Sequence, residues 1–493
     1  MGKTTAITES ITEKSYNRQD WQRGYESQPD EYDYPVGEIE GQIPVELRGT
    51  LFRNGPGLLD IGGTPIAHPF DGDGMISAFT FDNGRVHYRN RYVRTEAYIR
   101  EKAAGKPLYR GVFGTMKPGG WWANALDFRL KNIANTNILY WGDKLLALWE
   151  AAEPYRLDPR TLDTIGPDYL DGILQEGDPF SAHPRIDPGC LFDDDRPCLV
   201  NFAAKPGLSS QFTIFEFDRA GKLLRRHSHS LPGFSFIHDF AITPNYCIFF
   251  QNPVSFNPFP YLLGLKGAGE CVTYEANQNT RIILIPRRPP HEDVKVVEIP
   301  SGFVFHHANA FERENTVCID SICYDSLPRV DPDSSYKEAN FEALDPGRLW
   351  RFTVDLQANS VKKELIESRC CEFPTLHPDR VGRDYRYLYI GTAHSPTGNA
   401  PLQAILKLDL QTGKRQLHSF APRGFAGEPI FVPKPGGTEE DDGWLLAPMY
   451  DAAKHRSSLV ILDARDLTTP VAIAHLKHHI PYGLHGSWTG EVF

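Results

Sequence analysis

The sequence predicts an all-β protein, and specifically a β-propeller of six to eight blades, with seven as the best estimate. Its 493 residues include 42 glycines and 39 prolines, which are spread through the chain between short apolar runs. This distribution is typical of many short strands joined by turns. A strand-turn-strand pattern also recurs along the chain, and no linker, charge block or low-complexity tract divides it beyond its first residues.

The recurring unit is an alternating strand that ends in an acidic turn and is followed by a return strand. It occurs at FTFDNGRVHY, YRLDPRTL, FEFDRAGKLL, FTVDLQANSV, LKLDLQTGKR and VILDARDLT, whose turn residues are Asp82, Asp158, Asp218, Asp355, Asp409 and Asp463. Another strand pair precedes several units, as in NILYWGDKLLALWE at residues 137–150. Four-stranded blades around an axis produce such a repeat. A tandem of β-sandwiches is the alternative, but no linker marks a boundary between two sandwiches.

Charge and cysteine content bear on partners and compartment. The net charge of −11 argues against a nucleic-acid partner. The eight cysteines include no Cys-x-x-Cys pair, so we expect reduced thiols and a cytoplasmic protein. Residues 1–15 are polar, and we expect a disordered tail there, followed by a single propeller domain over residues 16–493.

Four of the 17 histidines share a distinct context, beside apolar or turn residues at what reads as a strand start. They are His183 in SAHPRIDP, His238 in FSFIHDFAIT, His306 in VFHHANAF and His485 in YGLHGSW. Their separations of 55, 68 and 179 residues are those expected for one residue per blade, with two blades skipped before the last. Inner strands of a propeller line its axis, where four imidazoles would bind a first-row transition metal. The alternative for each is a core histidine bonded to a nearby carbonyl.

Three glutamates occupy strongly apolar surroundings and are candidate partners of these histidines. They are Glu150 in LALWEAA, Glu372 in RCCEFP and Glu428 in FAGEPIFVP. A metal-bound histidine usually donates its other N–H to a carboxylate or carbonyl, which fixes the tautomer. The alternative is that each glutamate is half exposed at the end of a strand.

Together with other segments, these stretches resemble the carotenoid cleavage oxygenase family. The matching segments run from about Tyr16 to Trp488 and include RNGPG, HPFDGDGM, KNIANTN, LALWE, SAHPR, FIHDFAIT, FHHANAF, CCEFP, GEPIFVP, EDDGW and LHGSW. The resemblance implies a seven-bladed propeller with a dome of loops and short helices over an axial metal site. It also implies one Fe(II) ion (Fe²⁺) per chain, held by His183, His238, His306 and His485.

The resemblance also implies roles for the neighbours of these ligands. His307 is then a packing or hydrogen-bonding neighbour of His306. The family's pattern makes Glu150 orient His238, Glu372 orient His306 and Glu428 orient His485, and it leaves His183 without a carboxylate.

The activity implied by the resemblance is oxidative cleavage of a carbon–carbon double bond, with O₂ as co-substrate. The alkene supplies the electrons, so neither NAD nor a flavin is required, and no G-x-G-x-x-G motif follows a strand. The expected substrate is an apolar polyene, an apocarotenal or apocarotenol cleaved at its 15,15′ double bond to retinal, or a derivative, and a shorter dialdehyde. Alternatives are another carotenoid bond or a stilbenoid alkene. Outside this class, the alternatives are a propeller that only binds proteins and a zinc or calcium hydrolase.

A polyene needs an apolar tunnel with few polar groups. Candidate wall residues lie in or beside the matching motifs, and the alternative for each is an ordinary core position. They are Phe70, Thr136, Trp149, Phe236 and Phe305.

Two segments, residues 119–130 and 257–267, place bulky apolar residues where loops or short helices are expected. One interpretation is packing over the end of the propeller. The other is an apolar surface that dips into a membrane and admits a hydrophobic substrate, which would make the protein peripherally membrane-associated.

Overall fold

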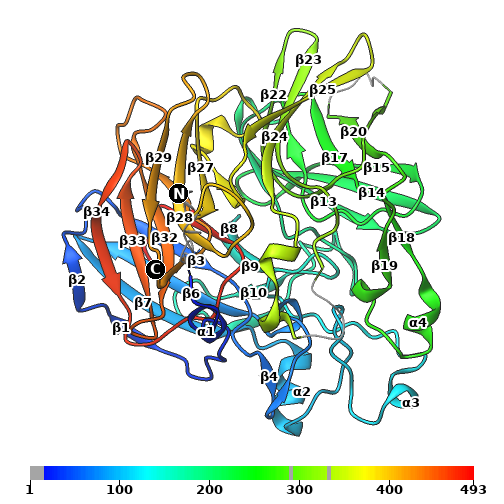
Figure 1. Ribbon diagram of the computed structural model, residues 1–493, viewed down its shortest axis with the longest axis horizontal. Coiled ribbons are helices and arrows are strands. Elements are labelled where there is room, and N and C mark those ends of the chain that lie inside the picture. The colour runs from blue at the N-terminus through cyan, green and yellow to red at the C-terminus, as the bar shows by residue number, and fades with distance from the viewer. Residues whose placement is uncertain (1–15, 288–292, 330–334) are drawn as a thin grey trace, which may run out of the picture.

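In a computed structural model that describes residues 16–287, 293–329 and 335–493, seven β-sheets of four or more strands surround a central axis (Figure 1). These sheets are the blades of the β-propeller that the sequence predicts. The tail expected at residues 1–15 lies outside the described residues.

Blades 2, 3, 5 and 6 are four-stranded antiparallel sheets whose strands follow one another in chain order from the axis outward. Blade 2 comprises β8 (Asn137–Trp141), β9 (Lys144–Leu148), β10 (Tyr155–Leu157) and β11 (Thr164–Pro167). Blade 3 comprises β12 (Arg185–Cys190), β13 (Arg196–Lys205), β14 (Ser209–Phe217) and β15 (Leu223–Pro232). Blade 5 comprises β22 (Phe303–Arg313), β23 (Thr316–Tyr324), β24 (Arg348–Asp355) and β25 (Ser360–Glu367). Blade 6 comprises β26 (Cys371–Thr375), β27 (Tyr387–Ala393), β28 (Leu402–Asp409) and β29 (Arg415–Ser419).

Blade 4 has the same order, but a long excursion separates its second and third strands. It comprises β16 (Ala241–Ile242), β17 (Tyr246–Gln251), β20 (Thr280–Pro286) and β21 (Lys295–Ile299). The excursion carries a two-stranded ribbon and two short helices. They are β18 (Val254–Phe256), β19 (Val272–Tyr274), α4 (Pro258–Leu262) and the 3₁₀ helix η2 (Gly269–Cys271).

The ring is closed by strands from both ends of the chain. In blade 1, the C-terminal strand is innermost and N-terminal strands complete the sheet. The order is β35 (Gly486–Thr489), β3 (Gly49–Arg53), β6 (Met75–Asp82), β7 (Arg85–Tyr92) and β1 (Asp33–Pro35). In blade 7, the N-terminal β2 (Glu38–Gly41) is the outer strand beside β34 (Figure 1). The other strands of blade 7 are β30 (Gly424–Ala426), β31 (Ile430–Pro433), β32 (Gly443–Asp451), β33 (Arg456–Asp463) and β34 (Asp466–His475).

The six acidic turns of the sequence repeat all fall at one place, the hairpin between the third strand of a blade and the strand outside it. The carboxylates of several of them accept backbone N–H groups two to four residues later, as Asp218 does from Ala220 and Lys222. This contact closes the turn at the strand end. Blade 4 lacks this sequence repeat, because the chain between β20 and β21 reads PPHED at residues 289–293 instead of a strand that ends in the Asp turn.

The hydrophobic core consists of layers between neighbouring blades. Because successive side chains of a strand point to opposite faces, each strand contributes to two layers. In β17, Ile248 packs with residues of blade 5, whereas Phe249 packs with residues of blade 3. The blade 7–blade 1 layer contains Leu51 and Ile461, both fully buried, and so holds the closure of the ring.

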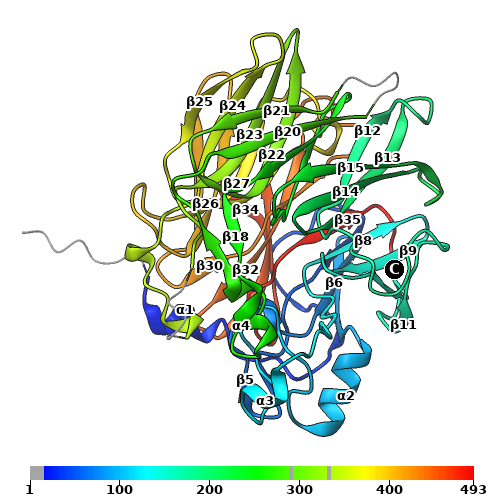
Figure 2. The ribbon, with the colours of Figure 1, turned by 90° about the vertical axis from the view of Figure 1, so that its right-hand side faces the viewer.

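Helices and long loops gather at one end of the propeller, where Figure 2 shows α2, α3 and α4. The helices outside blade 4 are α1 (Arg18–Arg23), α2 (Glu96–Ala104), α3 (Trp121–Asn124), η1 (Pro69–Asp71), η3 (Tyr336–Glu338), η4 (Phe341–Ala343) and η5 (Pro378–Arg380). A small ribbon, β4 (Asp60–Ile61) with β5 (Thr64–Pro65), lies among them. Apart from η5, which lies between β26 and β27 and contacts β12, these segments are the dome of loops and short helices that the family resemblance implies.

The layer between blades 7 and 1 gives a first prediction. Ile461→Ala should lower the free energy of unfolding by roughly 2–5 kcal/mol, because it leaves a cavity in a fully buried layer. Urea unfolding followed by tryptophan fluorescence measures this change. Leu365→Ala in the outer strand β25 is the control, since Leu365 is 42% exposed and its loss should cost little. Equal effects of the two substitutions would contradict the assigned core.

Candidate metal centre

Each of the four predicted histidines lies at or near the start of the innermost strand of a different blade. His183 and His238 shortly precede β12 and β16, His306 lies in β22, and His485 directly precedes β35. These strands belong to blades 3, 4, 5 and 1. Blades 6 and 7 come between the blades of His306 and His485, which accounts for their longer separation in sequence.

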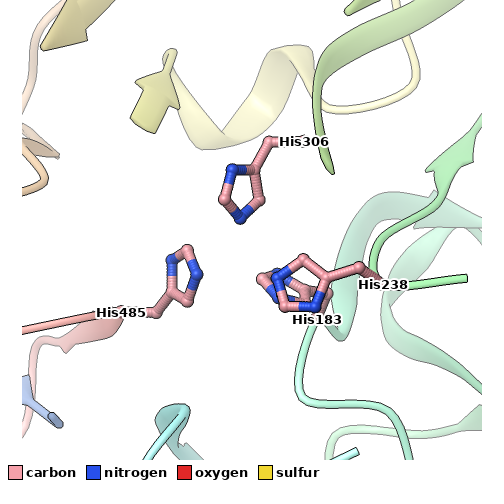
Figure 3. Close-up of side chains that lie close together, drawn as sticks. All are labelled: His183, His238, His306 and His485. Carbon is pink, nitrogen blue, oxygen red and sulfur yellow. The ribbon is translucent and has the colours of Figure 1, made fainter. Parts of the chain in front are cut away.

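The four imidazole rings converge on one point at the axis (Figure 3). Each offers a ring nitrogen, and the four nitrogens all lie within 4.8 Å of one another. Nε2 of His183 and Nε2 of His238 are 2.9 Å apart.

The three predicted glutamates hold the outer ring nitrogens of three of these histidines. Nδ1 of His238 lies 3.1 Å from a carboxylate oxygen of Glu150. Nδ1 of His306 lies 2.6 Å from one of Glu372, and Nδ1 of His485 lies 2.8 Å from one of Glu428. Because an ionised carboxylate only accepts hydrogen bonds, Nδ1 carries the proton and Nε2 presents a lone pair. The glutamates come from blades 2, 6 and 7, the three blades that supply no histidine.

Burial and charge together set the protonation of the centre. Burial and the other imidazoles lower the pKa of His183 well below its ordinary value, and burial also lowers the pKa of His485. For His306, burial acts to lower the pKa, but Glu372 and the carboxylates of Asp239 and Glu428 together raise it. Burial acts to raise the pKa values of the three glutamates, but their paired histidines and further nearby charges and hydrogen-bond donors together lower them. The glutamates are therefore ionised near neutral pH.

The arrangement of the nitrogens fits a bound metal ion. Nε2 of His306 is buried and has no hydrogen-bond partner among the described residues, so an unused lone pair faces the centre. Two nitrogens bound at right angles to one metal ion, with bonds of about 2.1 Å, lie about 3 Å apart, close to the separation of the His183 and His238 nitrogens. Imidazole is a usual ligand of zinc, copper, iron and nickel. The four histidines can therefore hold a first-row transition metal.

The three glutamates differ in how firmly they are themselves held. Glu372 accepts from the Tyr324 hydroxyl at 2.8 Å and from the backbone N–H of Phe373 at 2.9 Å. Glu428 accepts from Arg53 at 2.5 Å, and the side chains of this pair are only 12% and 8% exposed. Glu150 has no side-chain hydrogen-bond donor other than His238 in the described chain, and its side chain is 32% exposed.

A cavity of about 410 Å³ opens beside the imidazoles. His238, His306 and His485 border it, whereas His183 does not. All five residues predicted for a substrate tunnel also border it: Phe70, Thr136, Trp149, Phe236 and Phe305. Charged residues of the dome, such as Lys266, Glu270 and Arg329, line another part of its wall. Burial lowers the pKa of His68, also in the wall, to about 4, so this imidazole is neutral.

Several residues of the centre were not indicated by the sequence. Phe373 has a left-handed φ of 58°, which is rare for a bulky residue, and its ring packs on His306 and His485. Its position next to Glu372 was the only available signal. Tyr324 lies 48 residues from Glu372 in an ordinary strand, and nothing in its surroundings marks it.

His307 takes no part in the cluster. It is buried, and its Nδ1 lies 2.7 Å from the Ser321 hydroxyl. Cys190, Cys198 and Glu216 form a second group with closely spaced ligand atoms. However, Arg287 Nη2 donates to Glu216 at 2.8 Å in a fully buried ion pair, so this carboxylate already has its cation. All eight cysteines are free.

Comparison with known proteins identifies the class first. The model of the family described as Retinal pigment epithelial membrane protein (RPE65) matches residues 25–490. The chain therefore belongs to the RPE65/carotenoid oxygenase family, and the family resemblance noted in its motifs is confirmed.

Comparisons with individual relatives are more specific than the family match. The chain is 60% identical to apocarotenoid-15,15′-oxygenase of Synechocystis over 98% of its own length and 99% of the relative's. It is 31% identical to isoeugenol monooxygenase of Pseudomonas putida, over 92% and 94% of the two chains. The crystal structure of cobalt-substituted Synechocystis apocarotenoid oxygenase superposes with a TM-score of 0.95 at 59% identity, covering 97% of this chain and 100% of that one.

The unequal support of the glutamates gives a second prediction. Glu428→Gln should cost about 3–5 kcal/mol of folding stability, because it leaves the buried Arg53 guanidinium without its counter-charge. Glu150→Gln should cost less than about 1 kcal/mol, since the carboxylate has no cationic partner to strand. Thermal unfolding of the two metal-free proteins measures the difference. A Glu150 variant as unstable as the Glu428 variant would contradict this account.

Proposed function

We propose that this protein is an Fe(II) dioxygenase that cleaves the 15,15′ double bond of apocarotenals or apocarotenols. The products are retinal, or a derivative, and a shorter dialdehyde from an apocarotenal, or the corresponding hydroxyaldehyde from an apocarotenol. The observation that carries the proposal is the four-histidine centre that opens onto an aromatic-lined cavity. Identity of 60% to a Synechocystis enzyme named for this bond supports the choice of substrate.

Each part of the centre has a proposed role. His183, His238, His306 and His485 hold one Fe(II) ion, which when bound supplies the activation of O₂. Glu150, Glu372 and Glu428 keep Nδ1 of their histidines protonated, so that each Nε2 lone pair faces the metal. The related crystal structure is of a cobalt-substituted form of the Synechocystis enzyme, which supports the use of cobalt as a stand-in metal in experiments.

The cavity walls would hold the polyene against the centre. Trp149 borders the cavity directly before Glu150, and Phe305 directly before His306, so both rings lie next to groups of the metal site. Phe236, two residues before His238, completes an aromatic wall. These rings exclude water and offer apolar surface to a conjugated chain. One alkene and one O₂ give two carbonyl groups, so the reaction balances without an external reductant.

A different alkene is the second candidate. The relatives near 30% identity include isoeugenol monooxygenase and a lignostilbene-α,β-dioxygenase of Sphingomonas paucimobilis. Their lower identity favours the apocarotenoid, but the bond cleaved depends on how far the polyene extends past the metal, and product analysis decides it.

The third prediction tests the reaction directly. Iron-loaded protein incubated in air with a C27 or C30 apocarotenal should form retinal, detected by HPLC with mass spectrometry, and should contain about one iron per chain. His238→Ala should remain folded yet bind no iron and form no product. His87→Ala is the matched control, because His87 is a surface residue paired with Asp33. Products from a stilbenoid but not from the apocarotenal would favour the second candidate, and no aldehyde from any alkene would reject the enzyme.

We also propose that the dome attaches to a membrane surface. Large apolar side chains are exposed in the two segments singled out from the sequence: Trp121, Trp122, Leu126, Phe128, Leu130, Phe259, Leu263 and Leu265. The segments adjoin each other, since the backbone N–H of Leu126 donates to the carbonyl of Leu262 at 3.0 Å. The buried Arg110 bridges them by donating to the carbonyls of Asn124 and Lys266.

This apolar surface adjoins the cavity. Lys266 borders the cavity, and its neighbour Leu265 is 57% exposed. A hydrophobic substrate dissolved in a bilayer could therefore enter beside α4 without crossing water. None of the described helices is both long enough and apolar enough to cross a membrane.

The fourth prediction concerns this contact. Trp122→Ser combined with Phe259→Ser should weaken binding to phosphatidylcholine vesicles by about tenfold or more, because each replaced ring buries apolar surface worth over 1 kcal/mol. Vesicle co-sedimentation measures the bound fraction. Leu365→Ser, an exposed leucine in β25 away from the dome, should bind as the unmodified protein does. Undiminished binding of the double variant would contradict the assignment.

A further inference from the structure

An ion pair with a buried carboxylate connects three of the blades that carry the histidines. Arg185 Nη2 donates to Asp239 Oδ2 at 2.6 Å, and the Asp239 side chain is only 1% exposed. Arg185 lies two residues after His183 in blade 3, and Asp239 directly follows His238 in blade 4. The pair therefore lies immediately beside two of the four imidazoles in the chain.

The same pair fixes the backbone beside a third histidine. Asp239 Oδ2 also accepts the backbone N–H of His307 at 2.8 Å, and Arg185 Nη2 donates to the His307 carbonyl at 3.0 Å. Arg185 Nε donates to the Phe240 carbonyl at 2.9 Å, and Asp239 Oδ1 accepts the Phe240 N–H at 2.8 Å. One carboxylate and one guanidinium thus hold the chain next to His183, His238 and His306.

Asp239 also supplies charge where the glutamates do not. His183 has no glutamate partner, but Asp239 Oδ1 lies 4.0 Å from its Nδ1. This distance is too long for a hydrogen bond, yet it is short for two charged groups in a buried site. If Nε2 of His183 faces the metal, Nδ1 carries the proton and points its partial positive charge toward this carboxylate.

We propose that Asp239, held by Arg185, is a positioning residue for the metal centre. It acts as the carboxylate of His183 and locks the backbone that sets the directions of His238 and His306. The inference rests on the proposed metal binding by the four histidines, and it assigns no contact with substrate.

Cobalt binding to the metal-free protein tests this without measuring catalysis. Asp239→Asn keeps the size of the side chain but removes its charge. Its amide also places N–H groups against the N–H donors from which the Asp239 carboxylate accepts. Titration with Co(II), followed by visible d–d absorption, should show affinity weakened by about 10- to 100-fold and a changed spectrum. Both readouts report the ligand field and not merely the amount of folded protein.

Asp409→Asn is the matched control. Asp409 is buried, accepts from Arg386 at 3.1 and 2.7 Å and from the backbone N–H groups of Gln411 and Thr412, and lies at the outer hairpin of blade 6. The Asp409→Asn substitution should lower the unfolding midpoint to an extent similar to that of Asp239→Asn, while leaving the cobalt affinity and spectrum unchanged.

A second variant tests the same proposal if the Asp239→Asn protein does not fold. Arg185→Lys keeps the positive charge but cannot donate to Asp239, Phe240 and His307 together, so it should weaken cobalt binding several-fold. Unchanged affinity and spectrum in the folded variants would overturn the proposal, as would equal losses in the Asp239 and Asp409 variants. If the unmodified protein bound no cobalt, the metal centre itself would be refuted instead.

Discussion

The centre of this molecule depends on the close approach of four imidazole nitrogens, whose lone pairs only a bound cation can stabilise together. Nitrogens that converge within 4.8 Å bring their lone pairs together, and one proton could bridge only a single pair of them. All seven blades contribute to the centre. Four contribute one histidine each, and the other three contribute the glutamates that hold three of these histidines. Every blade therefore takes part in one axial site.

Such convergence requires a rigid ring, because each imidazole comes from a different sheet. Apolar layers between neighbouring blades provide that rigidity, and strands from both ends of the chain close the circle. Largely buried ion pairs add fixed points near the axis, since Arg53 holds Glu428 and Arg185 holds Asp239. Burying such charges is costly unless each is paired, so the partners of a ligand-orienting carboxylate matter as much as the carboxylate. The open side of the centre faces the aromatic cavity, and the dome above it carries the exposed apolar surface.

Much of the site could be predicted from sequence because its residues occupy equivalent places in repeated units. The acidic hairpins marked six of the seven blades, and the spacing of His183, His238, His306 and His485 matched a blade period. The glutamates stood out because a carboxylate in an apolar run needs a partner. Tyr324 and Asp239 were not indicated by the same reasoning. Tyr324 is an ordinary strand residue, and Asp239 reads as a polar neighbour of His238 until the fold brings Arg185 and His307 to it.

The sequence by itself determined the all-β class, the blade repeat and the set of imidazoles and carboxylates that could form a metal site. Local alternation of apolar and polar side chains and short turn motifs encode these features, so they can be read within about ten residues of chain. The residue patterns alone did not pair the carboxylates with the imidazoles, a pairing that the family resemblance implied and the tertiary structure shows. Only the tertiary structure decided where the cavity opens and that the segments around Leu126 and Leu262 adjoin. Those contacts join residues tens to hundreds of positions apart, and they arise from how seven sheets pack in a closed ring, which no local pattern specifies.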